Sequence, residues 1–208
     1  MQRRSFLKQA VGLTAAVLSC NAGVMGEESC SPIAPYITRC TAGIPIGRLD
    51  GVTAFQQQSE WCWAACISMV FAYYGHRVSQ TRIVQEAWGA VVNMPGDPDR
   101  ILSDLNRTWK DDRGKSFSST GDSLTANAAT AVIDLKEGRP LIIGALGHAT
   151  VLTALTSDIN TATGAWQVVA ATVRDPWPSN GGRRILSPQE WYNINFVTRI
   201  SVEDEDDD

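Results

Sequence analysis

The sequence predicts an α+β fold, in which a helical half is followed by a half built from strands. In the first half, apolar residues recur with helical spacing in four segments that carry capping residues at their ends. After residue 138 the pattern changes to short apolar runs rich in Ile, Val, Leu and Thr, which is typical of strands. Tight connections between these runs favour antiparallel pairing. We therefore expect a cleft where the two halves meet.

The helices are expected over residues 61–74, 79–89, 97–109 and 122–138. For the first, Ser59 is the expected N-cap and Gly75 the residue that ends it. Its apolar residues occupy most of the circumference, so this helix should lie inside the domain. The third should start with Asp97 as N-cap and Pro98 in the first turn, and the fourth should stop at Gly138.

The strand half contains two apolar runs within residues 139–158, broken at Gly147. Two further runs cover residues 165–178 and 195–202, with a short helix expected at residues 187–193 between them.

Both ends of the chain look separate from the fold. Residues 1–26 have a basic start and an apolar run too short to span a membrane, which is the layout of an export signal. The run RRSFLK resembles the twin-arginine signal, so we expect export to the bacterial periplasm or beyond, with cleavage near Gly26. Alternatively, VLSC resembles a lipoprotein box, and a lipid on Cys20 would then be the route to a membrane. The acidic run 203–208 is expected to be a solvated tail.

The segment 27–46 is Pro-rich and is expected to be irregular, and the main domain should cover 47–202. With 208 residues, the chain has the length of one domain with a substantial core. In an oxidising compartment Cys30 and Cys40 could bridge this segment, although free thiols are the alternative. The net charge of −4 argues against nucleic-acid binding.

Cys62 lies where the first helix begins, in the stretch SEWCWAACISMV. Unpaired N–H groups and the helix dipole favour an anion there, and the thiolate is the reactive form of cysteine. Cys62 is therefore a candidate nucleophile, and an ordinary buried thiol is the alternative. Cys66, one turn further along the same face, is expected to be a small buried residue or to bridge to the Cys30 region.

A thiolate needs a base, and the chain has two histidines. His148 follows Gly147 at the start of an apolar strand; such a histidine is usually a core residue, but a candidate nucleophile upstream favours a general base. His76 lies about 20 Å from Cys62 along the helix axis and is expected to be a surface turn residue. Asp175 ends a strand before Pro176 and could orient His148, or could simply form a turn.

The run Cys62-Trp63-Ala64 resembles the active-site helix of papain-like cysteine proteases. The form QQQSEWCWAA is more similar to a bacterial branch related to secreted avirulence effector proteases, as are GHATVL and RDPWP. The resemblance covers residues 55–200. Papain itself has Asn as its third member and a Cys-Gly upstream of the nucleophile, whereas this chain has Asp175 and lacks that dipeptide.

This resemblance implies a papain-like fold and hydrolysis of peptide bonds through a thioester, without a cofactor or metal. Cys62 would attack, His148 would protonate the leaving amine, and Asp175 would orient His148. Gln56, or Gln58 as the near alternative, would complete an oxyanion hole with the Cys62 N–H. The expected partner is a protein or peptide substrate, and the chain is expected to be a monomer.

Three other readings use the same residues. Zinc bound by Cys62, Cys66 and a histidine is disfavoured because two cysteines four apart in an apolar helix are not the usual spacing. An inactive binding protein of the same fold is disfavoured by the intact set of Cys62, His148 and Asp175. Related thiol acyl transfer, such as deamidation, transglutamination or amidase action, would need the same groups.

Overall fold

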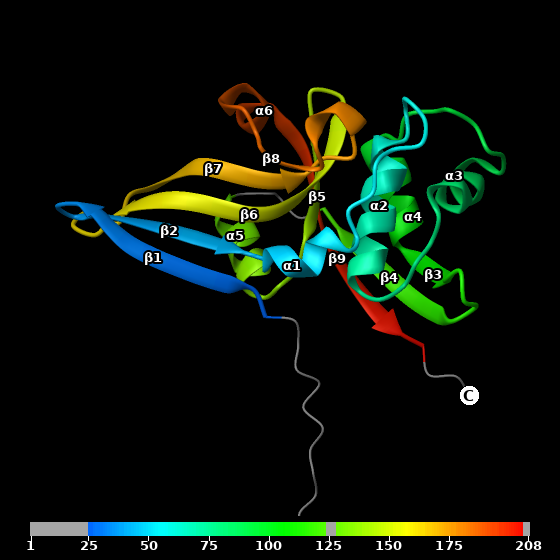
Figure 1. Cartoon of the computed structure of the whole chain (residues 1–208), viewed down its shortest axis with the longest axis horizontal. Coiled ribbons are helices and arrows are strands. Elements are labelled where there is room, and N and C mark those ends of the chain that lie inside the picture. The colour runs from blue at the N-terminus through cyan, green and yellow to red at the C-terminus, as the bar shows by residue number, and fades with distance from the viewer. Residues whose placement is uncertain (1–24, 124–127, 206–208) are drawn as a thin grey trace, which may run out of the picture.

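The computed structural model describes residues 25–123 and 128–205 (Figure 1). Cys20 and all but the last two residues of the predicted export signal lie outside the described residues. The helices are α1 (Ile46–Asp50), α2 (Cys62–Tyr73), α3 (Gln80–Trp88), α4 (Pro98–Leu105), α5 (Ala128–Lys136), the 3-10 helix η1 (Pro178–Asn180) and α6 (Pro188–Tyr192). The strands are β1 (Glu27–Ala34), β2 (Ile37–Gly43), β3 (Arg107–Lys110), β4 (Ser116–Asp122), β5 (Leu141–Ala145), β6 (His148–Asn160), β7 (Trp166–Arg174), β8 (Arg183–Ile185) and β9 (Ile194–Asp204). None of the described helices is both long enough and apolar enough to cross a bilayer.

The described strands form one antiparallel sheet in the order β1-β2-β6-β5-β9-β4-β3. A branch adds β7 to β6 and β8 to β7. In Figure 1, β1, β2, β6 and β7 extend to one side, and α2, α3 and α4 gather with β3 and β4 on the other. The α+β prediction is therefore confirmed, and so is the antiparallel pairing.

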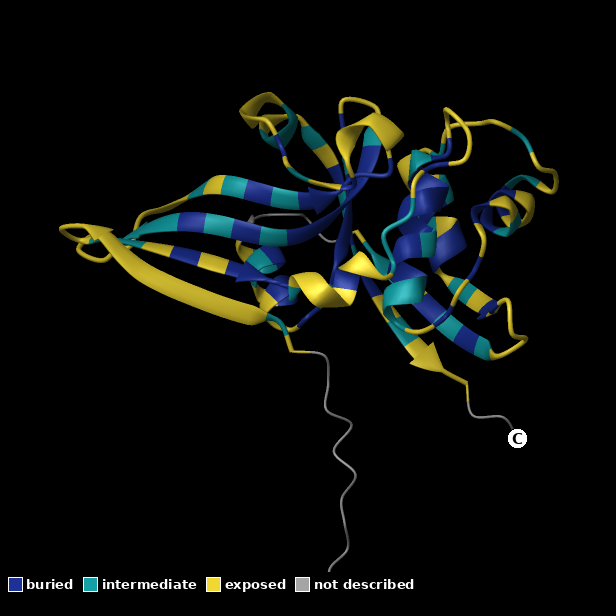
Figure 2. Cartoon of the chain, viewed as in Figure 1, coloured by how far each residue is buried: buried dark blue, intermediate teal, exposed yellow. Residues whose placement is uncertain are grey.

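The core consists of two clusters that meet at β5 and β6. On β5, Ile142 packs into the cluster around α2, while its neighbour Ile143 packs into the cluster with α5. Val151 and Leu152 on β6 divide in the same way. Successive side chains of a strand point to opposite faces, so strands covered on both faces read as continuous apolar runs. Figure 2 shows this buried centre between exposed ends.

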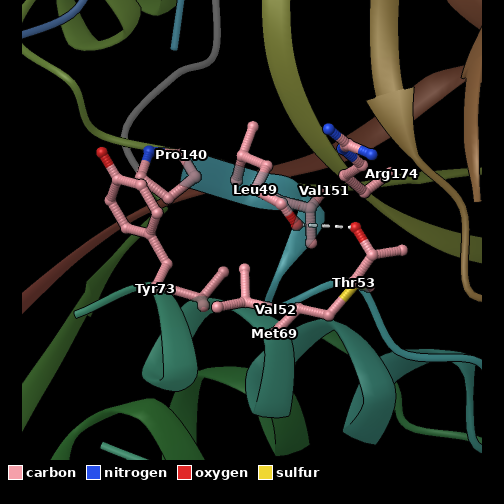
Figure 3. A pocket seen from close by; sticks show the side chains of 9 residues that line it. Leu49, Val52, Thr53, Met69, Tyr73, Pro140, Val151 and Arg174 are labelled. Carbon is pink, nitrogen blue, oxygen red and sulfur yellow. Dashed lines mark hydrogen bonds between the residues drawn. The ribbon is translucent and has the colours of Figure 1, made fainter. Parts of the chain in front are cut away.

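The two clusters fit closely where α1 packs on α2. Leu49 and Val52 face Met69 and Tyr73 of α2 there, and the remaining cavity measures about 10 Å³ (Figure 3). That volume is close to the space of a single water molecule. The helix bearing the candidate nucleophile is thus held from behind by packed side chains.

Helix α2 is fully buried along most of its length, as predicted, but its cap differs. It begins at Cys62 with Trp61 as N-cap, and no side chain caps it. The prediction of Ser59 as N-cap is wrong: its hydroxyl accepts a hydrogen bond from the Asn93 amide at 2.9 Å. For α4 the predicted N-cap Asp97 is confirmed, because its side chain accepts a hydrogen bond from the main chain of the first turn. Ser79 caps α3 in the same way.

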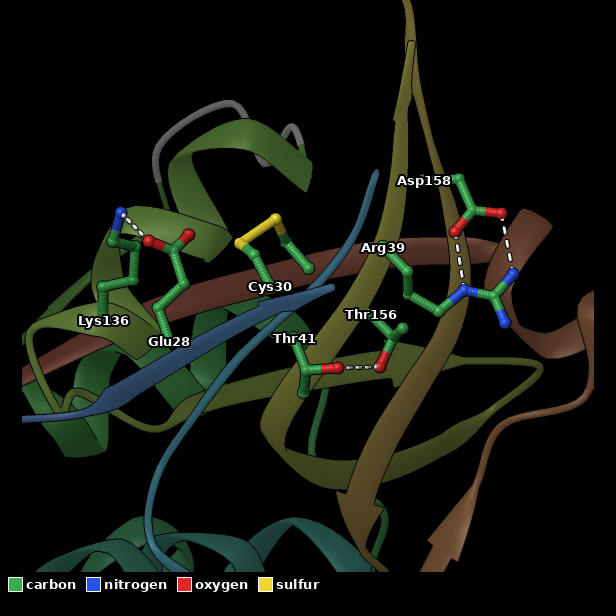
Figure 4. Close-up of a disulfide and its surroundings, with 8 residues drawn as sticks. Glu28, Cys30, Arg39, Thr41, Lys136, Thr156 and Asp158 are labelled. Carbon is green, nitrogen blue, oxygen red and sulfur yellow. Dashed lines mark hydrogen bonds and ion pairs between the residues drawn. A yellow bond between two sulfur atoms is a disulfide. The ribbon is translucent and has the colours of Figure 1, made fainter. Parts of the chain in front are cut away.

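The segment 27–46 is not irregular, contrary to prediction. It forms the hairpin β1–β2, and β2 pairs with β6 at the edge of the sheet. The Cys30–Cys40 disulfide, one of the two expectations for these cysteines, joins the two strands directly across from each other (Figure 4). Cys66 is free and buried, as expected, and the alternative of a bridge from Cys66 to this segment is wrong. Arg39 reinforces the attachment with two hydrogen bonds to Asp158 at 2.6 and 2.7 Å.

Two further predictions are corrected at β9. The predicted acidic tail starts too early, because Glu203 and Asp204 belong to β9. Asp204 also pairs with His76, and the distance between Asp204 Oδ1 and His76 Nε2 is 2.9 Å. His76 is therefore not a surface turn residue: it is 4% exposed and stacks on Phe117 with ring centroids 4.1 Å apart. It supports the end of the sheet.

Candidate active site

Cys62 is the first residue of α2 and is half-buried at the wall of a cleft. The indoles on either side of it are 3% and 0% exposed, for Trp61 and Trp63 respectively. Their N–H groups donate to the main-chain carbonyls of Val92 at 2.8 Å and Met94 at 3.1 Å. The two tryptophans therefore anchor the loop after α3 to the start of α2, which fixes the surroundings of the thiol.

His148 is the first residue of β6, directly after a tight turn. In that turn Leu146 and Gly147 both have positive φ, of 53° and 78°. The His148 Nε2 lies 2.8 Å from Asp175 Oδ1. Because that nitrogen faces Asp175, Nδ1 is the one left for Cys62. Burial lowers the pKa of His148, but hydrogen bonds to the Asp175 carboxylate and the Cys62 sulfur outweigh burial and raise it from 6.5 to about 9.

Asp175 follows the last residue of β7 and is completely buried. Besides His148, it accepts hydrogen bonds from the Trp177 N–H at 2.8 Å, the Asn180 amide at 2.9 Å and the Arg184 guanidinium at 2.6 Å. Burial alone would raise the pKa of Asp175, but these donors hold it well below its usual range. The carboxylate is thus ionised and fixed, which is more than a turn-forming Asp-Pro requires.

Trp177 covers the other side of the imidazole. Its ring meets that of His148 edge-on, with centroids 6.1 Å apart and an interplanar angle of 86°. The indole is 42% exposed and lines the cleft. It therefore forms part of the cleft wall next to the imidazole.

Gln56 is buried beside this group but is engaged elsewhere. Its side-chain amide donates both hydrogens, to the carbonyls of Gln58 at 2.9 Å and Ser59 at 2.8 Å. Its main-chain N–H donates to the Pro176 carbonyl at 2.8 Å. Gln56 therefore fastens the loop before α2 to the loop that carries Asp175. In this arrangement its amide does not face the cleft, so its role as an oxyanion donor stays a prediction; Gln58 is exposed.

The cleft has a volume of about 910 Å³ and lies between the helical half and the sheet. The start of α2, the 94–98 loop and α4 form one wall, and the β5–β6 turn, the β7–β8 connection and the start of β9 form the other. Trp88, Met94, Ile101 and Phe196 give it an apolar lining. The predicted cleft at the junction of the two halves is confirmed.

Three polar residues near Asp175 were not foreseen from the sequence: Asn180, Arg184 and Glu190. Arg184 pairs with Asp175 and Glu190, and both charged residues line the cleft. The only sequence signal at this corner is Ser-Pro-Gln-Glu, a capping pattern that predicts a helix start and gives no hint of the contact with Asp175.

Across the part of the chain that is described, no three His, Cys, Asp or Glu side chains are grouped so that they could hold a metal ion. Cys66 is fully buried beneath Cys62, and burial raises the pKa of its thiol well above the usual value. His76 lies at the opposite end of α2, paired with Asp111 and Asp204. Among the described residues, Cys62 and Cys66 thus form no metal-binding group with either histidine.

Solved structures with a similar arrangement are distant in sequence. A double glycine motif protease from an AMS/PCAT transporter, solved with the leader peptide, is 17% identical with a TM-score of 0.45, over 74% of this chain and 91% of its own. The peptidase domain of Streptococcus ComA, a bi-functional ABC transporter involved in a quorum sensing pathway, is 16% identical with a TM-score of 0.49. This match covers 73% of the present chain and 97% of the ComA domain. UfSP from C. elegans is 17% identical with a TM-score of 0.45, and the match covers 91% of the present chain and 36% of UfSP.

Comparison with curated protein sequences gives no match. A family model does match, over residues 49–198, and this range includes Cys62, His148 and Asp175. The match covers well over half of the sequence and nearly all of the cleft-forming elements. The chain belongs to the Peptidase_C39 like family, and it is accordingly a papain-like cysteine-type peptidase.

Proposed function

We propose that this chain is an exported peptidase that cleaves peptide bonds with a triad of Cys62, His148 and Asp175. The observation that carries the triad is the 2.8 Å hydrogen bond between His148 Nε2 and the buried Asp175 carboxylate, on an imidazole whose pKa the Cys62 sulfur also raises. With its pKa raised to about 9, His148 is an imidazolium at neutral pH and can stabilise a thiolate.

The reaction would begin with attack of the Cys62 thiolate on the carbonyl carbon of a bound peptide. The developing oxyanion is stabilised by the Cys62 main-chain N–H, one of the unpaired donors in the first turn of α2, worth about 3 kcal/mol. The His148 imidazolium then gives its proton to the leaving amine, and a thioester remains. Neutral His148 next takes a proton from water as the resulting hydroxide attacks the thioester carbonyl, and expulsion of the Cys62 sulfur restores the thiolate–imidazolium pair.

Export is supported by two features. The RRSFLK run followed by a short apolar stretch has the layout of a twin-arginine signal. The Cys30–Cys40 disulfide is a bond that persists in oxidising compartments and is rare in the cytosol. We further propose kinship with the bacterial branch of secreted avirulence effector proteases, which is supported by the QQQSEWCWAA, GHATVL and RDPWP runs.

The test is to incubate the purified chain beginning at Glu27 with a peptide library and to identify products by mass spectrometry. We expect cleavage by the wild type and none by Cys62→Ala. Cys66→Ala is the matched control, because it removes the same group one turn deeper and should keep the activity. Products that are deamidated or cross-linked instead of cleaved would assign a different thiol acyl transfer, and equal activity of Cys62→Ala would overturn the triad.

A further inference from the structure

The polar network at the cleft continues beyond Asp175. Arg184 of β8 donates its Nε–H to Asp175 Oδ2 at 2.6 Å. The two terminal nitrogens of the same guanidinium bond to the two carboxylate oxygens of Glu190, at 3.0 and 2.6 Å. One planar guanidinium therefore bridges two carboxylates, and a bidentate pair of this kind fixes direction as well as distance.

Glu190 is itself fixed to the main chain. It lies in the first turn of α6, where its carboxylate accepts the Ser187 N–H at 2.8 Å and its own N–H donates to the Ser187 hydroxyl at 3.2 Å. This reciprocal capping box holds the side chain in one place at a helix start. Hydrogen bonds from Arg184 keep the pKa of Glu190 well below its usual range, so the bridge is charged at neutral pH.

We propose that Arg184 and Glu190 are positioning residues of the catalytic centre: Arg184 fixes the Asp175 carboxylate, and Glu190 offsets the charge of Arg184 so that Asp175 can still hold an imidazolium. The proposal rests on the triad assigned above. Neither residue reaches the sulfur or the imidazole; both act through Asp175.

The two residues should act on His148 in opposite directions. The ionisable groups directly against His148 are Cys62 from α2 and Asp175 after β7, with Arg184 of β8 and Glu190 of α6 behind the carboxylate. Removing the positive charge of Arg184 leaves Asp175 more negative in effect, which favours the imidazolium. Removing the negative charge of Glu190 leaves Arg184 uncompensated, which disfavours the imidazolium. A role limited to holding the fold together would give no such opposition.

The experiment is an NMR titration of the full chain labelled with ¹⁵N-histidine and free of any histidine tag. Only two imidazoles are present, so His148 is assigned by comparison with a His76→Gln variant. We expect Arg184→Gln to raise the titration midpoint of His148 and Glu190→Gln to lower it, each by about 0.5–1 pH unit. The double variant should return close to the wild type. Arg184→Lys should keep the midpoint, because the charge stays, yet reduce kcat, because one ammonium cannot reproduce the planar bridge.

Arg183→Gln is the matched control, since it removes the same charge from the neighbouring, exposed position of β8. It should leave the midpoint unchanged. Shifts in the same direction for Arg184→Gln and Glu190→Gln, or no shift, would overturn the proposal. If Arg184→Gln fails to fold, an unshifted His148 midpoint in Glu190→Gln is enough by itself to overturn the proposal. The titration does not need turnover, so the two hypotheses can fail separately. If the wild type cleaves no peptide but the two variants shift the His148 midpoint in opposite directions, the peptidase activity is refuted and the positioning role stands.

Discussion

Gly96 should be intolerant of even one added methyl group, because its backbone lies flat against Trp63. A Cβ built on Gly96 would come within 2.6 Å of two ring atoms of this indole. Ordinary van der Waals contact begins near 3.4 Å. The indole cannot move away, since it is fully buried and its N–H is bonded to Met94 O. Overpacking of this kind costs about 1–3 kcal/mol.

Replacing glycine also restricts the unfolded chain, which returns about 0.4–1 kcal/mol, so Gly96→Ala should lose about 1–2 kcal/mol of unfolding free energy. For a chain of this size the melting temperature should fall by about 2–8 °C. Gly51→Ala is the matched control: Gly51 has helical φ and ψ of −76° and −9°, and its Cβ would meet nothing within 4 Å. It should melt about 1–4 °C higher than the wild type. Equal melting temperatures for the two variants in differential scanning calorimetry would refute this account of the loop.

Three other outcomes follow from burial and linkage. Iodoacetamide should label Cys62 rapidly and leave Cys66 unmodified in the native protein, because Cys66 is fully buried; peptide mapping that finds comparable labelling would contradict the site. Replacing Cys30 and Cys40 with Ser should destabilise the β1–β2 hairpin by about 3 kcal/mol, seen as faster amide exchange there, without changing the labelling rate of Cys62. Burial raises the pKa of Asp104 from 3.8 to about 6. The carboxyl therefore ionises less readily in the folded state than in the unfolded state, and the unfolding free energy falls as the pH rises from about 4 to 6. Asp104→Asn should therefore gain up to about 3 kcal/mol above pH 6 and nothing below pH 4; a gain at low pH in urea unfolding would contradict that cause.

The elements that could be predicted are those whose pattern is set by burial. Helix α3 has Ser79 and Gly89 at its two ends and the strands β5 and β6 have apolar runs, so periodicity and caps located them. The β1–β2 hairpin could not be found this way, because all of β1 is exposed and carries no alternation of apolar and polar residues. Its strand conformation comes from pairing with β6, a contact more than a hundred residues away in the sequence.

The second hairpin, β3–β4, was missed for a different reason. The sequence of residues 107–109 gives no sign that helix α4 has ended. The helix ends at Asn106, whose side-chain amide donates a hydrogen bond to Leu102 O at 2.8 Å. Asn106 has φ and ψ of −99° and 65°, outside the helical region. A polar side chain that competes for the helix's own carbonyls ends it there, which composition alone does not reveal.

In the candidate site, the three residues of the proposed triad could be singled out because each stands at the end of an element that the sequence defines. Cys62 opens α2, His148 opens β6 and Asp175 follows β7. The oxyanion role of Gln56 was implied by the resemblance alone and stays a prediction; in the structure its amide donates to the carbonyls of Gln58 and Ser59. Arg184 could not be predicted, because nothing local distinguishes it from Arg183; which of the two reaches Asp175 depends on the pleat of β8.

The register of β6 and β7 explains why these ends converge. The two strands run antiparallel with Val151 opposite Arg174, so the start of β6 at His148 and the chain that leaves β7 toward Trp177 lie at the same end of the pair. The ring centroids of His148 and Trp177 are 6.1 Å apart there. The intervening Asp175 is left beside the imidazole, and its own N–H is bonded to Gly182 O at 2.5 Å, which turns the chain back into β8 with Arg184. The imidazole of His148, the Asp175 carboxylate and the guanidinium behind it are thus positioned by adjacent strands of one sheet. Only the sulfur comes from the other half, and two buried indoles and the loop they anchor hold it at the cleft.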